Sequence, residues 1–203
     1  MTVSLVWQGP FGVNSIPRDP LFFENLCQPG VYLRVKIYDY GRLVVYVGQS
    51  ASLLARFDQH LSSMLALASP LRDPSGEVVF SADAGVRLQA FKDLDRYSSL
   101  ACDDVRRVLF FYAKCDNYFH NEHLNLVEAL LQDRIRGRLN EIENAISAPS
   151  AIQDNLPDRW NNDFDALERA SRRILVKILG GLVMTFNQSD LKAILFYQGH
   201  VVV

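Results

Sequence analysis

The chain has 203 residues, 49% of them hydrophobic, and a formal net charge of −2 with a sequence pI near 6.1. This length and apolar content suffice for one well-buried core, so we expect a single domain with elaborations and exclude an intrinsically disordered chain. The weakly acidic balance excludes a generally basic protein that coats nucleic acid without sequence preference. Any affinity for a polyanion must therefore come from a local positive surface.

Cysteine use and hydropathy point to a cytoplasmic protein. The three cysteines, Cys27, Cys102 and Cys115, are odd in number and form no CxxC motif, which favours a reducing compartment over a disulfide scaffold. The N-terminus lacks a basic region followed by a continuous apolar core, so no signal peptide is expected. The apolar stretch 174–186 is too short to cross a bilayer, and we expect a buried helix that ends at the glycine pair 180–181 and no membrane association.

The first predicted element is a β-hairpin over 31–47. Apolar residues at 31, 33, 35 and 37 alternate with residues at 32, 34, 36 and 38, which is the period of a strand and assigns Tyr32 to the polar face. A turn over 39–42 leads to an apolar run over 43–47, which we interpret as a second strand buried on both sides. Tyr46 lies at the end of that strand.

A helix is predicted directly after the hairpin. Ser50 and Ser52 are suitable N-caps, and apolar residues at 53, 54, 57, 61 and 64 follow with helical spacing. Arg56 and His60 are four residues apart, so they share one face of this helix and can reach a common target. A phosphate is the natural target, because a guanidinium matches its oxygens bidentately and an imidazole can hold or protonate an oxygen near neutral pH.

The middle of the chain carries an insertion, a third strand and a second helix. Breaker residues over 69–76 and a helical pattern over 84–94 indicate that 65–104 has a structure of its own. A dense β-favouring run over 106–114 predicts the third strand. Glu128 then sits inside the apolar stripe of a helix, where a carboxylate is costly unless it is paired or binds a cation.

Together these residues resemble the GIY-YIG nucleases. Gly30-Val31-Tyr32 is similar to the first signature and Tyr46-Val47-Gly48 to the second, with valine replacing isoleucine in each, and the resemblance covers about residues 26–140. It implies an α+β fold with a small three-stranded antiparallel sheet flanked by helices. The boundaries are an N-terminal extension over 1–25, a core over 26–140 with the insertion 65–104, and a helical C-terminal extension over 141–203. The other family positions correspond to Arg56, His60, Glu128 and Asn140.

The resemblance implies metal-assisted hydrolysis of a DNA phosphodiester by water. Either Tyr32 or Tyr46 would act as general base or relay, and the choice stays open. Arg56 would stabilise the charge that develops on the phosphoryl oxygens, and His60 would hydrogen-bond the reacting groups or transfer a proton. Glu128 would hold Mg²⁺ or Mn²⁺. A tyrosine with an ordinary pKa of about 10 is a poor base, so Arg56 and the metal would have to lower it.

Three positions have supporting roles in the resemblance, and one of them departs from the family pattern. Gly48 closes the second signature, and Asn140 falls where many members carry a terminal asparagine. Gln49 stands where some relatives, notably excision-repair incision nucleases, carry a lysine, so one positive charge is missing. The hairpin is a few residues longer than in the usual core, which should matter little at its tip.

Every position also has an ordinary structural interpretation. Tyr32 and Tyr46 could be strand aromatics, and Arg56 with His60 could be a solvated helix face. Glu128 could form a structural ion pair with Arg134 or another cation, and Asn140 could be a helix C-cap.

Basic clusters and a histidine pair are weaker signals. Arg134, Arg136 and Arg138 on one helix, and Arg172 and Arg173 on a later one, could contact a DNA backbone, but cations near a helix C-terminus also complement the helix dipole. His120 and His123 could suggest zinc, yet no cysteine completes a recognised spacing, and a solvated helix start is the favoured interpretation.

The leading hypothesis is a standalone, metal-dependent DNA endonuclease, site-specific and restriction- or defence-like. One active site cuts one strand, so double-strand cleavage would require a homodimer. A repair or recombination incision nuclease or a nuclease toxin working with partners is the second hypothesis, and RNA as substrate stays open. A nucleic-acid binding module that has lost catalysis is the alternative of another class.

Overall fold

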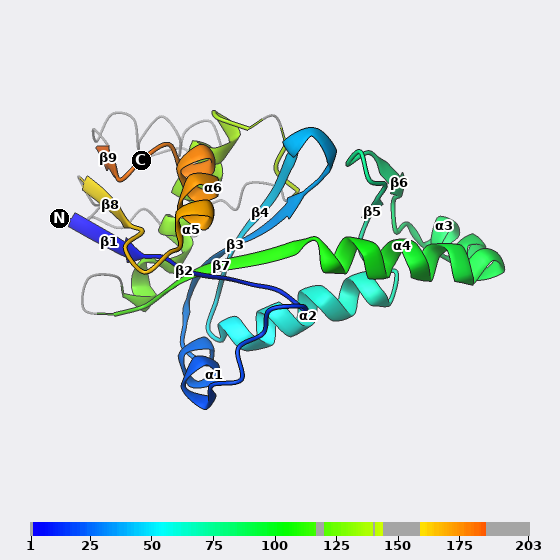
Figure 1. Cartoon of the computed structure of the whole chain (residues 1–203), viewed down its shortest axis with the longest axis horizontal. Helices are drawn as coiled ribbons and strands as arrows, with labels where there is room; N and C mark the ends of the chain where they lie inside the picture. The colour runs from blue at the N-terminus through cyan, green and yellow to red at the C-terminus, as the bar shows by residue number, and fades with distance from the viewer. Residues whose placement is uncertain (1, 117–119, 140, 144–158, 186–203) are drawn as a thin grey trace, which may run out of the picture.

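The computed structural model describes residues 2–116, 120–139, 141–143 and 159–185. The fold is α+β, as expected, with helices on both faces of an antiparallel sheet (Figure 1). The α-helices are α1 (Pro20–Leu26), α2 (Leu53–Leu65), α3 (Ala84–Ala90), α4 (Leu94–Arg106), α5 (Leu124–Arg136) and α6 (Arg169–Leu179), with short 3₁₀ turns η1 (Asp39–Gly41), η2 (Phe91–Asp93) and η3 (Asn121–His123).

The central sheet has four strands, where the sequence predicted three. Its order is β2-β7-β3-β4, and all its pairs are antiparallel. The predicted hairpin forms β3 and β4, and the predicted third strand pairs with β3 as β7. The additional strand, β2, comes from the segment expected to be an N-terminal extension, which therefore completes the core sheet. The strands are β2 (Gln8–Phe11), β3 (Gly30–Ile37), β4 (Leu43–Ser50) and β7 (Val108–Lys114).

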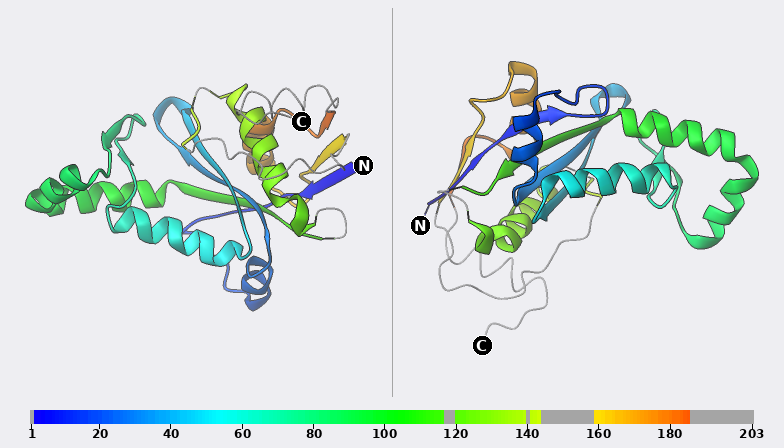
Figure 2. Two further views of the ribbon diagram at one scale, coloured as in Figure 1. Left: turned by 180° about the vertical axis from the view of Figure 1, so that it is seen from behind. Right: turned by 90° about the horizontal axis from the view of Figure 1, so that it is seen from below.

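Helices bury both faces of this sheet. Because side chains alternate along a strand, β3 sends Val31 and Leu33 to one face and Tyr32 to the other, and all three are fully buried. Helix α5 packs on the face of Val31, and α2 packs on the face of Tyr32 together with Phe110. The views from behind and from below show the two helices on their separate sides (Figure 2).

The C-terminal segment is not purely helical, which corrects the expectation. A second sheet of order β1-β8-β9 joins the two ends of the chain, with β1 parallel to β8 and β9 antiparallel to it. Trp7 and Trp160 both donate from Nε1 to the Asn162 side chain, at 2.9 and 3.2 Å. Helix α6 ends at Gly180, whose φ of 86° favours glycine. The strands are β1 (Thr2–Val6), β8 (Arg159–Asp163) and β9 (Val183–Thr185).

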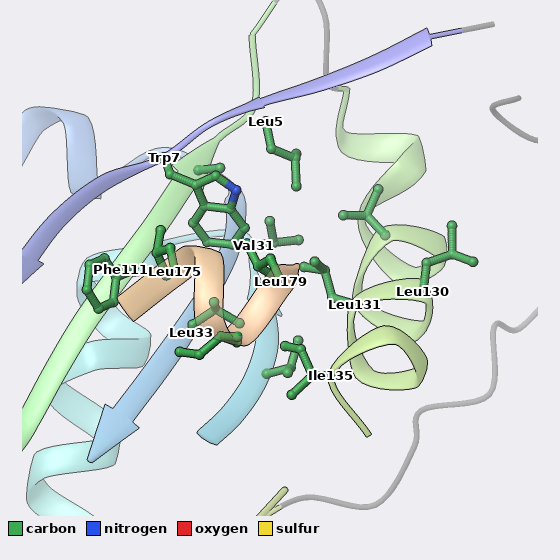
Figure 3. Packing of buried hydrophobic residues seen from close by; sticks show 14 of the residues in the cluster. Leu5, Trp7, Val31, Leu33, Phe111, Leu130, Leu131, Ile135, Leu175 and Leu179 are labelled. Atoms are coloured by element: carbon green, nitrogen blue, oxygen red, sulfur yellow. The ribbon is translucent and has the colours of Figure 1, made fainter. Parts of the chain in front are cut away.

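The main apolar core lies between the central sheet, α5, α6 and the second sheet. Figure 3 shows Trp7 beside Val31 and Leu175 beside Phe111, with Leu131 and Ile135 of α5 on the other side of the cluster. This core holds the scaffold of β3 and β4 in place from one side. The opposite side of the sheet is left to α2 and the side chains described below.

The insertion has its own structure, as predicted. A short hairpin of β5 (Leu71–Arg72) and β6 (Val78–Phe80) packs with α3 and α4 around a small core that includes Leu67, Phe80 and Ala101. Helix α4 runs through Arg106 and β7 begins at Val108, so the strand starts later than the predicted residue 106. In Figure 1 this unit extends away from the sheet on the side opposite α5 and α6.

Among the residues that the structure describes, no helix combines the length and apolar character needed to cross a bilayer. Cys27, Cys102 and Cys115 are all free thiols.

Candidate functional site

Four of the predicted site residues come together on one face of the sheet. Tyr32 lies on β3, Tyr46 on β4, and Arg56 and His60 on α2. The Arg56 guanidinium donates from Nε to the Tyr32 hydroxyl at 2.9 Å and from Nη2 to the Tyr46 hydroxyl at 3.1 Å. The Tyr32 hydroxyl also lies 2.8 Å from His60 Nε2. The two signatures and the helix therefore form one hydrogen-bonded network.

Local sequence explains how these side chains meet. The Ser52 side chain caps α2 by accepting from the Ala55 backbone N–H at 3.4 Å. This cap starts the helix directly after β4, so Arg56 and His60, one turn apart, both face the sheet. His60 is only 8% exposed, which rules out the solvated helix face as its environment.

Gly48 makes room for Tyr32. The two residues are register partners in the β3–β4 pair, and a Cβ at position 48 would overlap the Tyr32 hydroxyl and ring. Glycine is therefore required here for close approach, and no unusual φ is involved. This gives the supporting position of the second signature a steric role.

The sequence did not identify Arg34 as a site residue. In the structure, Arg34 contacts His60 on the side away from Tyr32. Its Nη1 lies 2.8 Å from His60 Nδ1, its Nη2 forms an ion pair with Glu143, and its guanidinium carbon lies 4.9 Å from the centre of the Tyr46 ring. Arg34 shares the two-residue alternation of Tyr32, and this signal could have found it. No local signal marks Glu143, because it reaches the site by a long-range return of the chain.

A second ion-pair cluster adjoins the first on the same face. Lys36 is 1% exposed and donates to Asp104 at 2.6 Å, and it lies 3.5 Å from Glu143. Asp104 also accepts a 2.5 Å hydrogen bond from the Tyr38 hydroxyl. Arg72 of the insertion approaches Glu143 at 3.3 Å. Buried charges are thus paired across β3, α4 and the 141–143 segment, as the cost of burying a lone charge requires.

A cleft of about 380 Å³ opens over this network. Three arginines, Arg34, Arg56 and Arg72, line it against the Glu143 carboxylate, and Arg72 also pairs with Glu141, so the cleft keeps a net positive charge although the chain is weakly acidic. Tyr46 lines the cleft, whereas Tyr32 is fully buried behind it. The insertion supplies one wall, and the 141–143 segment closes another. The wall from the insertion consists of Ser69, Pro70, Arg72, Val78 and Ser81.

Burial governs protonation in the network. Burial lowers the pKa of His60 to about 3, and the positive charges of Arg34 and Arg56 act in the same direction. Burial also raises the pKa of the Tyr32 hydroxyl, and this outweighs the hydrogen bond from Arg56, which lowers it. At neutral pH both side chains are therefore uncharged, in contrast to the expectation that Arg56 activates a tyrosinate at position 32.

Glu143 stays ionised for the opposite reason. Burial alone would raise its pKa, but the positive charges of Arg34 and Lys36 outweigh burial and lower it to about 2. The carboxylate therefore neutralises part of the positive cleft over the whole physiological pH range.

Glu128 does not line the cleft. It lies on α5, which packs on the opposite face of the sheet, and it is buried with its Oε1 accepting from Gln132 at 3.3 Å. Within the described ranges, no group of three or more His, Cys, Asp or Glu side chains is placed to hold a metal ion. The one carboxylate in the cleft, Glu143, already pairs with Arg34. Among the described residues, the cleft therefore offers a divalent cation no carboxylate that is not already in an ion pair, and Asn140 lies outside the described residues.

Most of the other predicted positions have structural contacts. Gln49 donates to Asn125 of α5 at 3.1 Å, so its side chain belongs to the face away from the cleft. Arg134 and Arg138 donate to the Leu179 and Lys177 carbonyls at the C-terminal end of α6, a different helix from the one whose dipole they were expected to complement. The remaining contacts are those of Arg172 with the Phe164 carbonyl and Asp165, and of the His120 backbone N–H with His123 Nδ1 at the start of α5. Arg136 and Arg173 are exposed.

Comparisons of the chain with protein-family models, with curated proteins and with solved structures find no match. The resemblance to GIY-YIG nucleases therefore stays a prediction from the signature residues of the sequence.

Proposed function

We propose that this chain is an endonuclease that hydrolyses DNA phosphodiester bonds, with the scissile phosphate bound in the cleft between the sheet, α2 and the insertion. The observation that carries the proposal is the hydrogen-bonded network of Arg56 with both signature tyrosines. A phosphate in the cleft would meet guanidinium groups that suit its oxygens. Because the chain as a whole is weakly acidic, DNA binding needs a local positive surface, and the cleft supplies one.

The side chains of the network have distinct roles in this proposal. Arg56 stabilises the negative charge that develops on the phosphoryl oxygens, in a partly buried site where such interactions are strong. Tyr46 is the tyrosine that contacts and orients the attacking water or the phosphate, which its exposure to the cleft supports. Tyr32 holds Arg56 and His60 from behind. The water oxygen forms the new bond to phosphorus and releases a proton to solvent through the cleft. The bond to the leaving oxygen breaks, and that oxygen takes up a proton from solvent, so the products are a phosphomonoester and an alcohol.

Dependence on Mg²⁺ or Mn²⁺ stays a prediction of the family resemblance. Glu128 is its candidate ligand, although its position on α5 outside the cleft gives that role no support. The roles proposed for Arg56, Tyr46 and Tyr32 do not involve a metal. Removal of divalent cations with a chelator, beside a Glu128→Ala variant, tests this prediction directly.

The insertion is the proposed source of substrate recognition, because it supplies a wall of the cleft that carries Arg72 and the hydroxyl groups of Ser69 and Ser81. A restriction- or defence-like role would require two copies of the chain on a double-stranded site. Homodimerisation is accordingly a prediction, measured by sedimentation with and without DNA. Contact of Arg136 and Arg173 with the DNA backbone is a further prediction of this model.

A nucleic-acid binding module without turnover is a second candidate. One observation favours it: Glu128, the candidate metal ligand of the resemblance, does not line the cleft in the part of the chain that the structure describes. Such a module would keep the positive cleft and bind DNA without cutting it.

The test uses supercoiled plasmid and mixed genomic DNA in Mg²⁺, in Mn²⁺ and in chelator, with RNA in parallel. Arg56→Ala should lower the cleavage rate by about 10²- to 10³-fold, and Tyr46→Phe by a similar amount. Arg96→Ala is the matched control, because Arg96 is an exposed arginine on α4 outside the cleft lining. Discrete fragments indicate a site-specific endonuclease, and nicking alone indicates an incision enzyme. DNA binding without cleavage selects the binding module, and the absence of both overturns the proposal.

A further inference from the structure

Among the described residues that line the cleft, Arg34 is the cation that contacts both the His60 ring and a carboxylate. It is 6% exposed, and its two terminal nitrogens reach His60 and Glu143. Neither contact belongs to the signature motifs. Arg34 therefore connects the segment 141–143 with the tyrosines through His60.

We propose that Arg34 is a positioning residue that holds His60 as the neutral tautomer with its proton on Nε2, so that His60 donates a hydrogen bond to Tyr32. The effect on cleavage rests on the proposed nuclease function, whereas the tautomer itself does not.

The chemistry of the two side chains fixes the direction of each hydrogen bond. A guanidinium has only donors, so His60 Nδ1, 2.8 Å from Arg34 Nη1, must accept. A neutral imidazole carries one N–H, which is then on Nε2. Nε2 lies 2.8 Å from the Tyr32 hydroxyl oxygen, so it donates to that oxygen. The same oxygen also accepts from Arg56 Nε at 2.9 Å, and both of its acceptor positions are therefore used.

The balance of charged and titratable groups around His60 favours a neutral ring. Strand β3 presents Tyr32, Arg34 and Lys36, β4 presents Tyr46 at 4.8 Å between ring centres, α2 presents Arg56, and the 141–143 segment presents Glu143. The three cations outweigh the single carboxylate. An imidazolium would also direct an N–H of its own at the Arg34 donor, which would break that hydrogen bond.

This arrangement changes the role expected for His60. The sequence suggested an imidazole that holds or protonates an oxygen near neutral pH. With Nδ1 occupied by Arg34 and Nε2 donating to Tyr32, His60 neither supplies nor receives the proton in the resting enzyme. Its work is to keep Tyr32 and, through Tyr32, Arg56 in the geometry that the phosphate requires.

The first experiment reads the tautomer in the full, unmodified chain. Long-range ¹H–¹⁵N NMR of histidine-labelled protein distinguishes protonated from unprotonated ring nitrogens, and a His60→Gln variant assigns the signals. At pH 7 we expect the Nε2–H tautomer for His60. An Nδ1–H tautomer or an imidazolium overturns the proposal, whether or not the protein cleaves DNA.

The second experiment removes the anchor. In Arg34→Met we expect a mixture of His60 tautomers, titration closer to the ordinary range, and a kcat for DNA cleavage lower by up to about 100-fold with KM little changed. Arg34→Lys, which keeps a cation and a donor, should restore part of the loss. Arg42→Met is the matched control, because Arg42 bonds Glu77 and Glu141 at a distance from the ring.

The two failures are distinguishable. An Arg34→Met protein that keeps the single Nε2–H tautomer overturns the positioning role, and so does a kcat equal to that of the control. A wild-type protein that shows the tautomer but binds and cleaves no nucleic acid contradicts the proposed function alone. If Arg34→Met does not fold, the wild-type spectrum still tests the proposed His60 tautomer.

Discussion

The two faces of the central sheet are buried to a similar extent, but one is apolar and the other is polar and charged. On β3, Val31, Leu33 and Val35 enter an apolar core with α5 and α6, while Arg34 and Lys36 enter a network of ion pairs and hydrogen bonds on the other face. Both sets are nearly inaccessible to water. One strand therefore serves as scaffold on one side and as a charged site on the other.

The difference shows where this fold accepts an energetic cost. Apolar burial stabilises at roughly 25 cal/mol per Å², whereas a buried ion pair seldom repays its desolvation. If the second face only had to cover the sheet, its residues would be apolar, like those of the first face. The polar face is retained at a cost, which is what a preorganised anion site requires.

The largest expected effect comes from breaking one buried pair. Lys36→Met leaves the Asp104 carboxylate buried with the Tyr38 hydroxyl as partner, and we expect a loss of about 3 to 5 kcal/mol in the free energy of unfolding. Urea unfolding measures it. The double variant Lys36→Met/Asp104→Leu should recover most of the loss, because no lone charge remains.

Leu33→Ala is the matched change on the apolar face. It should cost about 2 to 5 kcal/mol through a cavity, and no second polar substitution should rescue it. If the Lys36 and Asp104 changes prove simply additive, the two faces are energetically alike and the comparison fails.

The second effect is a pH dependence that belongs to the polar face. His60 has a folded-state pKa of about 3 against an ordinary 6.5, so between these values the unfolded chain binds more protons and stability falls as the pH falls. The slope reaches at most about 1.4 kcal/mol per pH unit, or roughly 2 to 3 kcal/mol from pH 6.5 to 4.5.

Glu143 contributes in a different window. Its stabilisation is present above the ordinary value of 4.5 and is lost as the pH falls toward its folded-state pKa of about 2. Thermal unfolding of His60→Gln between pH 4.5 and 6.5 should therefore show a flatter profile than the wild type. An unchanged slope would assign the effect to other groups.

The third effect tests the close approach of the two strands at the site. Gly48→Ala should push Tyr32 out of position and cost about 1 to 3 kcal/mol by overpacking, with loss of cleavage. Gly85→Ala is its control, since a Cβ there meets open space on helix α3 and should be neutral or stabilise by up to about 1 kcal/mol. Equal stability of both variants would show that Tyr32 can move at no cost.

The comparison also explains which features the sequence could predict. Alternation over 31–37 and helical spacing after Ser52 are local patterns, and they predicted β3, α2 and the shared helix face of Arg56 and His60, whereas the placement of Arg56 beside a signature tyrosine came from the family resemblance. Strand β2 was not predicted, because its partner β7 is about a hundred residues away in the sequence. The polar face of β3 was expected, but its burial depends on α4 and the 141–143 segment, which no local pattern connects to it.

Glu128 and Glu143 show the same limit in the site itself. A carboxylate in an apolar stripe marked Glu128, yet α5 packs on the other face of the sheet. Glu143 carries no periodic signal, and only the return of the chain beside β4 brings its backbone N–H to the Val45 carbonyl at 2.9 Å and its carboxylate to Arg34. Long-range contacts therefore decided which acid enters the cleft.

The smallest expected effect concerns Gln49, where some resembling enzymes carry lysine. Its side chain bonds Asn125 on the α5 side and does not line the cleft, so Gln49→Lys should change the free energy of unfolding by about 0.5 kcal/mol or less and leave the cleavage rate unchanged. Gln49→Ala serves as the control for loss of the hydrogen bond. A large rise in the cleavage rate with lysine alone would mean that a positive charge at the end of β4 reaches the phosphate. The side chain at position 49 would then act on the cleft from the opposite face, and the two faces would not be independent at the edge strand β4.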